Sequence, residues 1–544
     1  MNASRPEPDA APTAAAAPPR GSFAPLRERV FAVLWVATVL GNIGSFMRDV
    51  ASAWMVTELS ASPAAVALIQ AAATLPVFLL AIPAGVLSDI LDRRRFLIGI
   101  QLFLALVSLS LLVLAKLGLL SVTALVVLTF LGGIGAALMG PTWQSIVPEL
   151  VSRADLKSAV ALNSLGINIS RSIGPAVGGL LLASFGAALT YGADVLSYLF
   201  VIAALLWWRR PATADSALPE HLLGAFRAGI RFTRASRELH VVLVRAAVFF
   251  LFSSAVWALL PLVARQMLGG SAGFYGVLLG AVGAGAIAGA VTMPPLRAKL
   301  GADGLMLLAS LLAAGVMAAL SLAPPQWLAV LLLLVLGVGW IIALTSLNGV
   351  AQSILPNWVR GRGLAVYLTV FNGAMAAGSV GWGLVAQQIG LPMTLLAGAA
   401  GLVAVAAAFH RVKLPAGEAD LQPSRHWPEP LLAQPVAHDR GPVLVQVEYR
   451  VRKEDQPAFA QVMQRLSLER RRDGAYAWGL THDASDPERL LEWFFVESWA
   501  EHLRQHARVS QADAALQAEA ARYHAGPLPP QVRHYLALDP SAAD

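Results

Sequence analysis

Long apolar runs recur along most of the chain, separated by short polar or charged segments. A helix rising about 1.5 Å per residue needs roughly 20 apolar residues to cross about 30 Å of hydrocarbon. Because lipid offers no hydrogen-bond partners, such a run must satisfy its backbone groups internally, as a helix does. Twelve runs of this kind lie near residues 31–57, 64–88, 96–116, 121–148, 158–184, 187–208, 240–264, 272–294, 303–323, 327–350, 363–388 and 391–412. The pattern predicts an all-α polytopic membrane protein with twelve transmembrane helices.

The periodicity changes after the last of these runs. Residues 413–440 are rich in proline and polar side chains and predict a linker. Strand-like and amphipathic helical runs then alternate. The predicted strands lie at 443–451, 475–482, 489–497 and 532–536, and the predicted helices at 456–472, 499–508 and 513–524. The order strand–helix–strand–strand–helix–strand predicts a cytoplasmic α+β ferredoxin-like domain over residues 441–538.

Composition supports lipid as the solvent of the larger part. Of the 544 residues 57% are hydrophobic and 13% are charged, whereas soluble domains carry roughly 25% charged residues. The chain has no cysteine, which excludes disulfides and thiolate metal sites. Residues 1–25 are rich in alanine and proline, without the apolar core of a signal peptide, and predict a disordered cytoplasmic segment.

Loop charges predict the orientation of the bundle. Fifteen lysines and arginines lie in one set of alternate loops, against two, Lys116 and Arg265, in the other set. The positive-inside rule places the first set in the cytoplasm, and with an even number of spans both termini lie there too. The net charge of +7 is therefore interpreted as a topology signal and not as a sign of nucleic-acid binding. The fifteen are Arg93, Arg94, Arg95, Arg153, Lys157, Arg209, Arg210, Arg227, Arg231, Arg234, Arg237, Arg297, Lys299, Arg360 and Arg362.

The apolar part repeats itself at half its length. Gln-Ser-Ile-Val-Pro at 144–148 ends the fourth run, and Gln-Ser-Ile-Leu-Pro at 352–356 ends the tenth. Glycines of the fifth run are matched at similar spacing in the eleventh. Two bundles of six spans in the same orientation resemble the 6+6 plan of the major facilitator fold. We expect these bundles at 26–208 and 240–412.

The loop between the two bundles, 209–239, contains an amphipathic segment. Apolar side chains recur at helical spacing among four arginines in 220–239. This predicts a helix lying on the inner leaflet, and a partner-binding helix is the alternative. The apolar positions are Leu222, Phe226, Ile230 and Phe232.

The loop after the second run resembles the signature loop of the major facilitator superfamily. Gly85, Asp89, Arg93 and Arg94 stand at matching positions, whereas Asp92 replaces a family glycine. The glycine would permit close helix contact. A carboxylate followed by arginines at a cytoplasmic helix end can form a charge lock that opens when the transporter changes state. The alternative is that these charges only determine topology.

Four stretches, 42–54, 141–148, 163–179 and 358–362, resemble one branch of that superfamily, the enterobactin-exporter type, or transmembrane secretion effectors. The resemblance implies a bacterial inner-membrane transporter, not an enzyme, that exports a siderophore or drug-like compound by alternating access. It also implies coupling to protons and no cofactor. No Walker-type Gly-x-x-x-x-Gly-Lys is present, which leaves an ATP-driven pump unsupported.

The fifth run also resembles a motif associated with antiporters. Gly174, Pro175, Gly178 and Gly179 match its Gly-Pro and paired glycines, and Ser170 replaces an earlier family glycine. Small residues at this spacing let helices approach closely. A role in sealing the cavity and ordinary close packing are both consistent with the pattern.

Ionisable residues inside the apolar runs are few, and such residues are costly in lipid. Arg48 and Asp49 lie in the first run, Arg171 in the fifth and Asp194 in the sixth. If a carboxylate carries the coupled proton, Asp49 and Asp194 are the candidates. The first span lines the cavity in this fold, which favours Asp49. The alternative is a static salt bridge of Asp49 with Arg171 or Arg48.

Polar residues in both halves are candidates for a substrate cavity. Ser164, Asn168 and Arg171 fall at i, i+4 and i+7, on one face of a helix. The arginine could meet an anionic or catechol-like substrate. Any of these groups could instead make interhelical hydrogen bonds. The remaining candidates are Asn42, Tyr367, Asn372 and Trp382.

In the tail, stretches 470–478 and 501–508 resemble the dimeric α/β-barrel domain related to small cofactor-free monooxygenases. This implies a homodimer through the tail and raises a second hypothesis, a ligand-sensing or oxygenase-like activity on a membrane platform. His502 and His506 have the i, i+4 spacing that can hold a metal, but no third ligand is evident nearby in sequence. We therefore predict a solvated or interface helix and no metal.

Overall fold

A computed structural model describes most of the chain. It covers residues 23–152, 154–209, 222–356, 358–409, 411–417 and 439–538, with 424, 434, 436 and 437. The predicted disordered segment 1–25 and the predicted linker 413–440 therefore lie largely outside the described residues.

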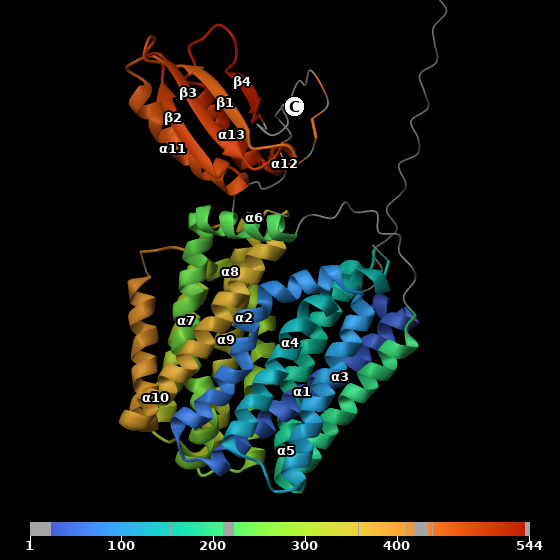
Figure 1. Ribbon diagram of the computed structural model, residues 1–544. Helices are drawn as coiled ribbons and strands as arrows, with labels where there is room; N and C mark the ends of the chain where they lie inside the picture. Colours follow the sequence, from blue (N-terminus) through green and yellow to red (C-terminus); the bar gives the residue numbers. More distant parts are fainter. Residues whose placement is uncertain are drawn as a thin grey trace, which may run out of the picture.

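Long helices form the larger part of the molecule (Figure 1). After a short 3-10 turn, η1 (Ala24–Arg27), five helices precede the middle loop: α1 (Arg29–Leu59), α2 (Pro63–Ile90), α3 (Arg93–Lys116), α4 (Val122–Leu150) and α5 (Leu156–Trp207). Ser62, Asp92 and Ser121 begin α2, α3 and α4 by accepting a backbone hydrogen bond with a side-chain oxygen.

The second half follows the loop helix α6 (Leu222–Ala235). It consists of α7 (Arg237–Leu262) with the π-helical turn η2 (Val263–Met267), α8 (Ala272–Ser321), α9 (Gln326–Ile354) and α10 (Arg360–Ala408). Nine helices of the described residues are long and apolar enough to cross a membrane. The expectation of a helical polytopic membrane protein is confirmed.

Three of these helices are interrupted by a glycine. α5, α8 and α10 have 52, 50 and 49 residues, or about 75 Å each at 1.5 Å per residue, more than twice the thickness of a bilayer core. Gly186, Gly301 and Gly390 break them with φ values of +79°, +62° and +78°. Only glycine adopts this backbone conformation without strain. Each of the three long helices therefore contains two segments of spanning length.

The glycines of the fifth run are packing positions. A Cβ atom at Gly178 would lie 2.7 Å from the Cα atom of Met47 in α1, and one at Gly179 would lie 2.7 Å from the Cα atom of Gly276 in α8. Gly174 is equally close to α1, where a Cβ would meet that of Phe46 at 2.6 Å. The motif therefore brings α5 into backbone contact with both α1 and α8, and α8 belongs to the second half.

The tail is a small α/β unit with a four-stranded antiparallel sheet of order β2-β3-β1-β4. Its strands are β1 (Val443–Arg450), β2 (Ala477–His482), β3 (Arg489–Val496) and β4 (Gln531–Leu536), and its helices are α11 (Gln456–Asp473), α12 (Trp499–Arg508) and α13 (Gln511–Ala521). Alternate β1 residues are buried, with Tyr449 packed on Phe459 of α11. The predicted elements of the tail match these within a few residues at each end.

The tail lies against one end of the bundle, next to α6 (Figure 1). Arg231 of α6 forms ion pairs with Glu497 and Glu501 of the tail, at 3.0 and 3.2 Å. Phe232 is buried against Trp358, and the Arg508 guanidinium lies 4.3 Å from the ring of the same tryptophan. Arg231 of α6 thus binds the chain's own tail.

Candidate functional site

A buried arginine is the centre of the charged cluster in the first half. The Arg48 side chain, on α1, is only 8% exposed. Its Nη2 lies 3.0 Å from Asp49 Oδ1, and its Nη1 donates to the hydroxyl of Tyr198 at 3.0 Å. The same Nη1 lies 3.7 Å from Asp194 Oδ2. One guanidinium therefore faces two carboxylates from spans far apart in sequence.

The second carboxylate, Asp194, is fully buried. Ser108 of α3 donates to its Oδ2 at 2.6 Å, and the side chain of Ser197 lies 3.4 Å from its Oδ1. Gly44 of α1 makes room for this group, because a Cβ atom there would lie 2.7 Å from Asp194 Oδ1. The carboxylate of the sixth run thus packs directly against α1.

The two carboxylates differ in access. The Asp49 side chain is 48% exposed, whereas that of Asp194 is 0% exposed. With all three groups ionised, the cluster carries one more negative than positive charge. Such a set can take up one proton and lose one ion pair without leaving Arg48 unpaired. Of the two salt bridges anticipated for Asp49, the structure forms the one with Arg48.

Arg171 lies apart from this cluster. It is partly buried, and no ion pair or hydrogen bond of its guanidinium appears among the described residues. On the same helix, the Asn168 amide donates to the carbonyl of Ser164 at 2.9 Å. The Ser164 hydroxyl donates to its own helix, at Val160. The three predicted residues therefore share a face, and neither short polar side chain is used in an interhelical bond.

The candidates in the second half are more enclosed. Tyr367 is fully buried, and its hydroxyl has no hydrogen-bond partner within the described chain. The Asn372 amide donates to Leu368 of its own helix at 2.9 Å. Trp382 donates to the carbonyl of Leu251 in α7 at 2.8 Å, so it joins two helices of one half. Asn42 in the first half is half-buried.

Sequence reasoning missed an aromatic cluster in the second half. Phe250 packs edge-on against Phe371 at 4.4 Å and against Trp340 at 5.2 Å, and Trp340 packs on Trp257 at 4.8 Å. The indole nitrogen of Trp257 is buried without a partner among the described residues. These aromatic residues come from α7, α9 and α10. A tryptophan in the middle of an apolar run was the available signal.

The signature loop holds helix ends together. Arg93 donates to Glu149 of α4 at 2.6 Å, and Arg94 donates to the carbonyls of Leu205 and Leu206 at 2.8 and 2.9 Å. Glu149 was not anticipated, although it directly follows the repeated Gln-Ser-Ile-Val-Pro.

Asp92, in place of the family glycine, caps α3 by accepting from the backbone of Arg95 at 2.8 Å. The expected close contact at Gly85 is wrong, because a Cβ atom there would meet no described atom within 4 Å. The side chain of Asp89 lies outside the described part.

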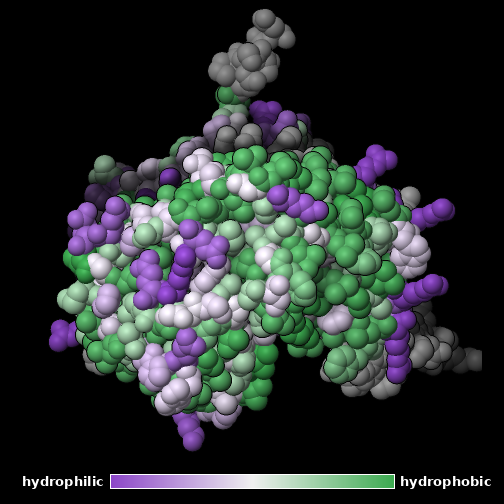
Figure 2. Space-filling view, turned by 90° about the horizontal axis from the view of Figure 1, so that it is seen from below, coloured by the Kyte–Doolittle hydropathy of each residue, from purple (hydrophilic) through white to green (hydrophobic). Residues whose placement is uncertain are grey.

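A cavity of about 670 Å³ lies at the end of the bundle away from the tail. Trp54 and Glu58, joined by a 2.9 Å hydrogen bond, line it from α1, and Arg265 lines it from the second half. Arg265 donates to Thr57 of α1 and so bridges the halves. Figure 2 views this end, and hydrophobic residues cover most of it, with hydrophilic ones in between.

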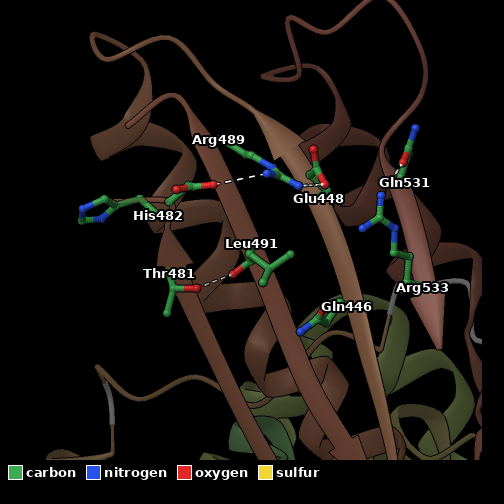
Figure 3. Close-up of a pocket in the computed structure, with 9 residues that line it drawn as sticks. Gln446, Glu448, Thr481, His482, Arg489, Leu491, Gln531 and Arg533 are labelled. Atoms are coloured by element: carbon green, nitrogen blue, oxygen red, sulfur yellow. Dashed lines mark hydrogen bonds and ion pairs between the residues drawn. The ribbon is translucent and has the colours of Figure 1, made fainter. Parts of the chain in front are cut away.

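The tail has a smaller hollow of about 210 Å³ on the sheet face (Figure 3). Arg489 lies between Glu448 and Asp483, at 2.8 and 3.2 Å. The hydrogen bond from Arg489 lowers the pKa of the Glu448 carboxyl. The ring of His482 points away from these groups. Both carboxylates are thus bound by the one arginine.

The tail also gathers three histidines. His502 and His506 of α12 meet His534 of β4, with one ring nitrogen of each within 4.8 Å of the others. Burial, and then the charges of His534 and His506, lower the pKa of His502 to about 3. The third histidine of this group, which the sequence did not reveal, comes from a strand 28 residues or more away along the chain.

Comparisons with known proteins agree with this architecture. A family described as "Transmembrane secretion effector" matches residues 20–542. The enterobactin exporter EntS of Escherichia coli O1:K1 / APEC is 31% identical over 306 residues, 55% of this chain and 71% of the relative. The staphyloferrin A transporter of Staphylococcus aureus is 22% identical over 276 residues, 50% of this chain and 68% of the relative.

Solved structures share the fold of the membrane part. The nucleoside transporter NupG covers 70% of this chain and 98% of its own, with a TM-score of 0.56 and 11% identity. A bacterial homologue of the lysosomal transporter Spinster, inward-facing and occupied, covers 70% and 96%, with a TM-score of 0.57 and 16% identity. This chain belongs to the transmembrane secretion effector family and is a major facilitator transporter related to siderophore exporters.

Proposed function

We propose that this protein exports a siderophore-like small molecule across the bacterial inner membrane by alternating access, driven by protons. The observation that carries the proposal is the buried Arg48 held between an exposed and a buried carboxylate. Two relatives, an enterobactin exporter and a staphyloferrin A transporter, support the substrate class.

The proposed topology is twelve spans in two bundles of six, with both termini and the tail in the cytoplasm. Nine spanning helices are described, and three of them contain a glycine break, which gives nine plus three spans. The excess of basic residues in the loops on the side of the tail supports the orientation. Rocking of the two bundles about a central site would then expose it to each side in turn.

In the proposed coupling, Asp49 exchanges the proton and Asp194 keeps Arg48 in place. Protonation of Asp49 removes the charge from its 3.0 Å contact, while the buried Asp194 at 3.7 Å retains a partner for the guanidinium. Because Tyr198 and Ser45 share a 2.9 Å hydrogen bond beside Arg48, α1 and the sixth span can move as one unit. Because Arg48 and Asp49 are neighbours on α1, loss of their contact would leave the guanidinium paired with Asp194 of the sixth span.

The proposed substrate contact is the polar face of the fifth span. Arg171 is a guanidinium without an ion pair in the part of the chain that the structure describes, next to Asn168 and Ser164. A carboxylate or catecholate of a siderophore would supply the missing negative charge and two acceptors. The gating residues Arg93 and Arg94 lie at the cytoplasmic helix ends, where the loop would lock and release during the cycle.

Everted membrane vesicles test the coupling. An imposed proton gradient should drive uptake of radiolabelled enterobactin or staphyloferrin A, and a protonophore should stop it. Asp49→Asn should abolish gradient-driven uptake while leaving the protein in the membrane. Glu238→Gln, an exposed acid at the start of α7 and outside the cluster, is the matched control. Uptake that does not depend on the proton gradient would contradict proton coupling. Unchanged gradient-driven uptake by Asp49→Asn would contradict coupling through this residue.

We also propose that the tail is a ferredoxin-like domain through which two copies pair. The strand order β2-β3-β1-β4 and the order of its elements fit that fold. One sheet face carries Trp493 and Phe495, and the ring of exposed Tyr476 lies tilted against that of Phe495 at 5.9 Å. Cross-linking of the full chain in native membranes should give dimers that Trp493→Glu abolishes. If cross-linking of the unaltered protein gives only monomers, the proposal that two copies pair through the tail is wrong.

The second candidate function, an oxygenase-like or sensing activity, also lies in the tail. The observation that favours it is the buried set in which Glu492 accepts from Arg470 and from Trp478, each at 3.0 Å. Substrate turnover by the full chain that Glu492→Gln abolishes, with transport intact, would favour this function over the first.

A further inference from the structure

The three histidines of the tail lie at a place that the transport cycle does not use. His502 and His506 are one helical turn apart on α12, and His534 comes from the edge strand β4 (Figure 1). The ring centres of His502 and His534 are 4.6 Å apart, and those of His502 and His506 are 4.7 Å apart. Among the described residues, no other histidine belongs to this cluster.

The separations match those of imidazole ligands on one ion. His502 Nε2 and His506 Nε2 are 3.2 Å apart. Two nitrogens at about 2.0–2.1 Å from a tetrahedral zinc ion are about 3.3 Å apart. The three ligand atoms lie within 4.8 Å of one another, so small rotations of the rings bring the third nitrogen into place. Three protein ligands leave the fourth position of such an ion open to water or another donor.

The surroundings of the cluster are those of a built site. His502 is 1% exposed, and its Nδ1 has no hydrogen-bond partner among the described residues. Gln505, one turn further on α12, is fully buried, and neither of its amide atoms has a partner in that part of the chain. Buried polar groups without partners are costly. Coordination through Nε2 of His502, with the Gln505 amide oxygen accepting from Nδ1, would satisfy the histidine and that oxygen.

We propose that His502, His506 and His534 bind a divalent transition-metal ion of the zinc class. Imidazole nitrogen suits Zn²⁺, Ni²⁺, Cu²⁺ and Fe²⁺, whereas Ca²⁺ and Mg²⁺ prefer oxygen donors. Trp499 packs on His502 at 5.3 Å and on His534 at 6.0 Å, and so shields one side of the site.

The position of the site links it to the membrane part. The same helix, α12, carries Glu501, which pairs with Arg231 of α6 and with Arg508. An ion held between α12 and β4 would join this helix to the sheet. It would therefore stabilise the surface that the tail presents to α6.

Metal binding by the full-length protein tests the proposal. The protein is purified in detergent with an affinity tag that contains no histidine, and is stripped with a chelator. Co²⁺ and Zn²⁺ are then added separately. We expect one equivalent per chain, cobalt absorption bands typical of a four-coordinate site, and displacement of Co²⁺ by Zn²⁺. Added Zn²⁺ should also raise the melting temperature.

Two substitutions distinguish loss of metal binding from loss of folding. His506→Ala and His534→Ala are both at half-buried positions, and each should weaken binding by at least about tenfold. His482→Ala, at an exposed position in β2, should leave stoichiometry and affinity unchanged. Gel filtration confirms the fold of each variant. No binding by the unaltered protein, or binding that both cluster variants retain, would overturn the proposal and leave a hydrogen bond between His502 and His506 as the explanation.

Discussion

The two halves of the bundle are built on one repeat but differ in chemistry. In the first half Arg48, Asp49 and Asp194 form a charged cluster with tyrosine and serine hydroxyls around it. In the second half, aromatic rings of Phe250 and Trp340 pack edge-on. The repeated Gln-Ser-Ile-Val/Leu-Pro stands at the end of α4 in the first half and at the end of α9 in the second.

This difference separates two tasks of a transporter. A charge buried in lipid costs several kcal/mol unless it is paired, so the first half keeps its charges only in a compensated cluster. The second half carries an ion pair as well, between Arg245 of α7 and Asp303 of α8, but it lies near the helix ends beside the backbone of Leu414. We expect the first half to respond to protons and the second half to keep its packing unchanged.

The strongest test of this comparison removes the arginine at the centre of the cluster. Arg48→Met leaves Asp194 buried without its guanidinium, and breaking a buried pair in this way costs about 3–5 kcal/mol. Thermal unfolding in detergent should show a large loss of stability and a low yield from membranes. Arg48→Lys keeps the positive charge and should recover most of the stability. Equal stability of Arg48→Met and the unaltered protein would mean that the cluster is not structural.

The stability of the second half should depend on side-chain packing and not on charge. Trp340→Leu loses edge-on contacts with Phe250 and Trp257, which are worth about 1–3 kcal/mol together. The melting temperature should fall while the pH dependence of transport stays as in the unaltered protein. Leu331→Ala, an exposed position on the same helix, is the control. A changed pH profile in Trp340→Leu would show that the halves do not divide these tasks.

Asp49→Asn should have a smaller effect on stability than either change. The side chain is 48% exposed, and an ion pair of this kind contributes about 0–1 kcal/mol. Its unfolding temperature should therefore stay close to that of the unaltered protein, although gradient-driven transport is lost. A large fall in stability would instead assign Asp49 to the static salt bridge that the sequence left open.

Of these four substitutions, Arg171→Gln should have the smallest effect on stability. The guanidinium has no ion pair among the described residues, so its removal breaks none there. Thermal unfolding should be unchanged, and the KM for an anionic siderophore should rise by about tenfold with little change in expression. Arg171→Lys should recover part of the affinity. An unaltered KM in Arg171→Gln would exclude this residue from the substrate contact.

Local patterns in the sequence anticipated much of the fold. Apolar length located the long helices, and alternation located the four strands described in the tail, because both depend on neighbours along the chain. The paired glycines of the fifth run were correctly interpreted as close contacts, since a missing Cβ has this consequence in any helix pair. The partner of Gly179, by contrast, proved to be Gly276 in the other half, which no local pattern indicates.

The candidate site was predictable only as a set of residues. The sequence named Arg48, Asp49 and Asp194 because charges in lipid are rare, but left the pairing of Asp49 open between Arg48 and Arg171. The aromatic cluster was missed because tryptophan and phenylalanine are ordinary residues in apolar runs. Glu149 was missed because its partner Arg93 lies 56 positions away.

The sequence by itself determined that the chain is a membrane protein with an α/β tail, because hydrophobic length and periodicity act over a few residues at a time. Tertiary structure alone decided which groups meet. Asp194 reaches Arg48 only because the sixth span packs on α1. His534 joins His502 and His506 only because β4 pairs beside β1, next to α12. Such contacts join segments far apart in the chain, and their distances follow from packing, which no local pattern contains.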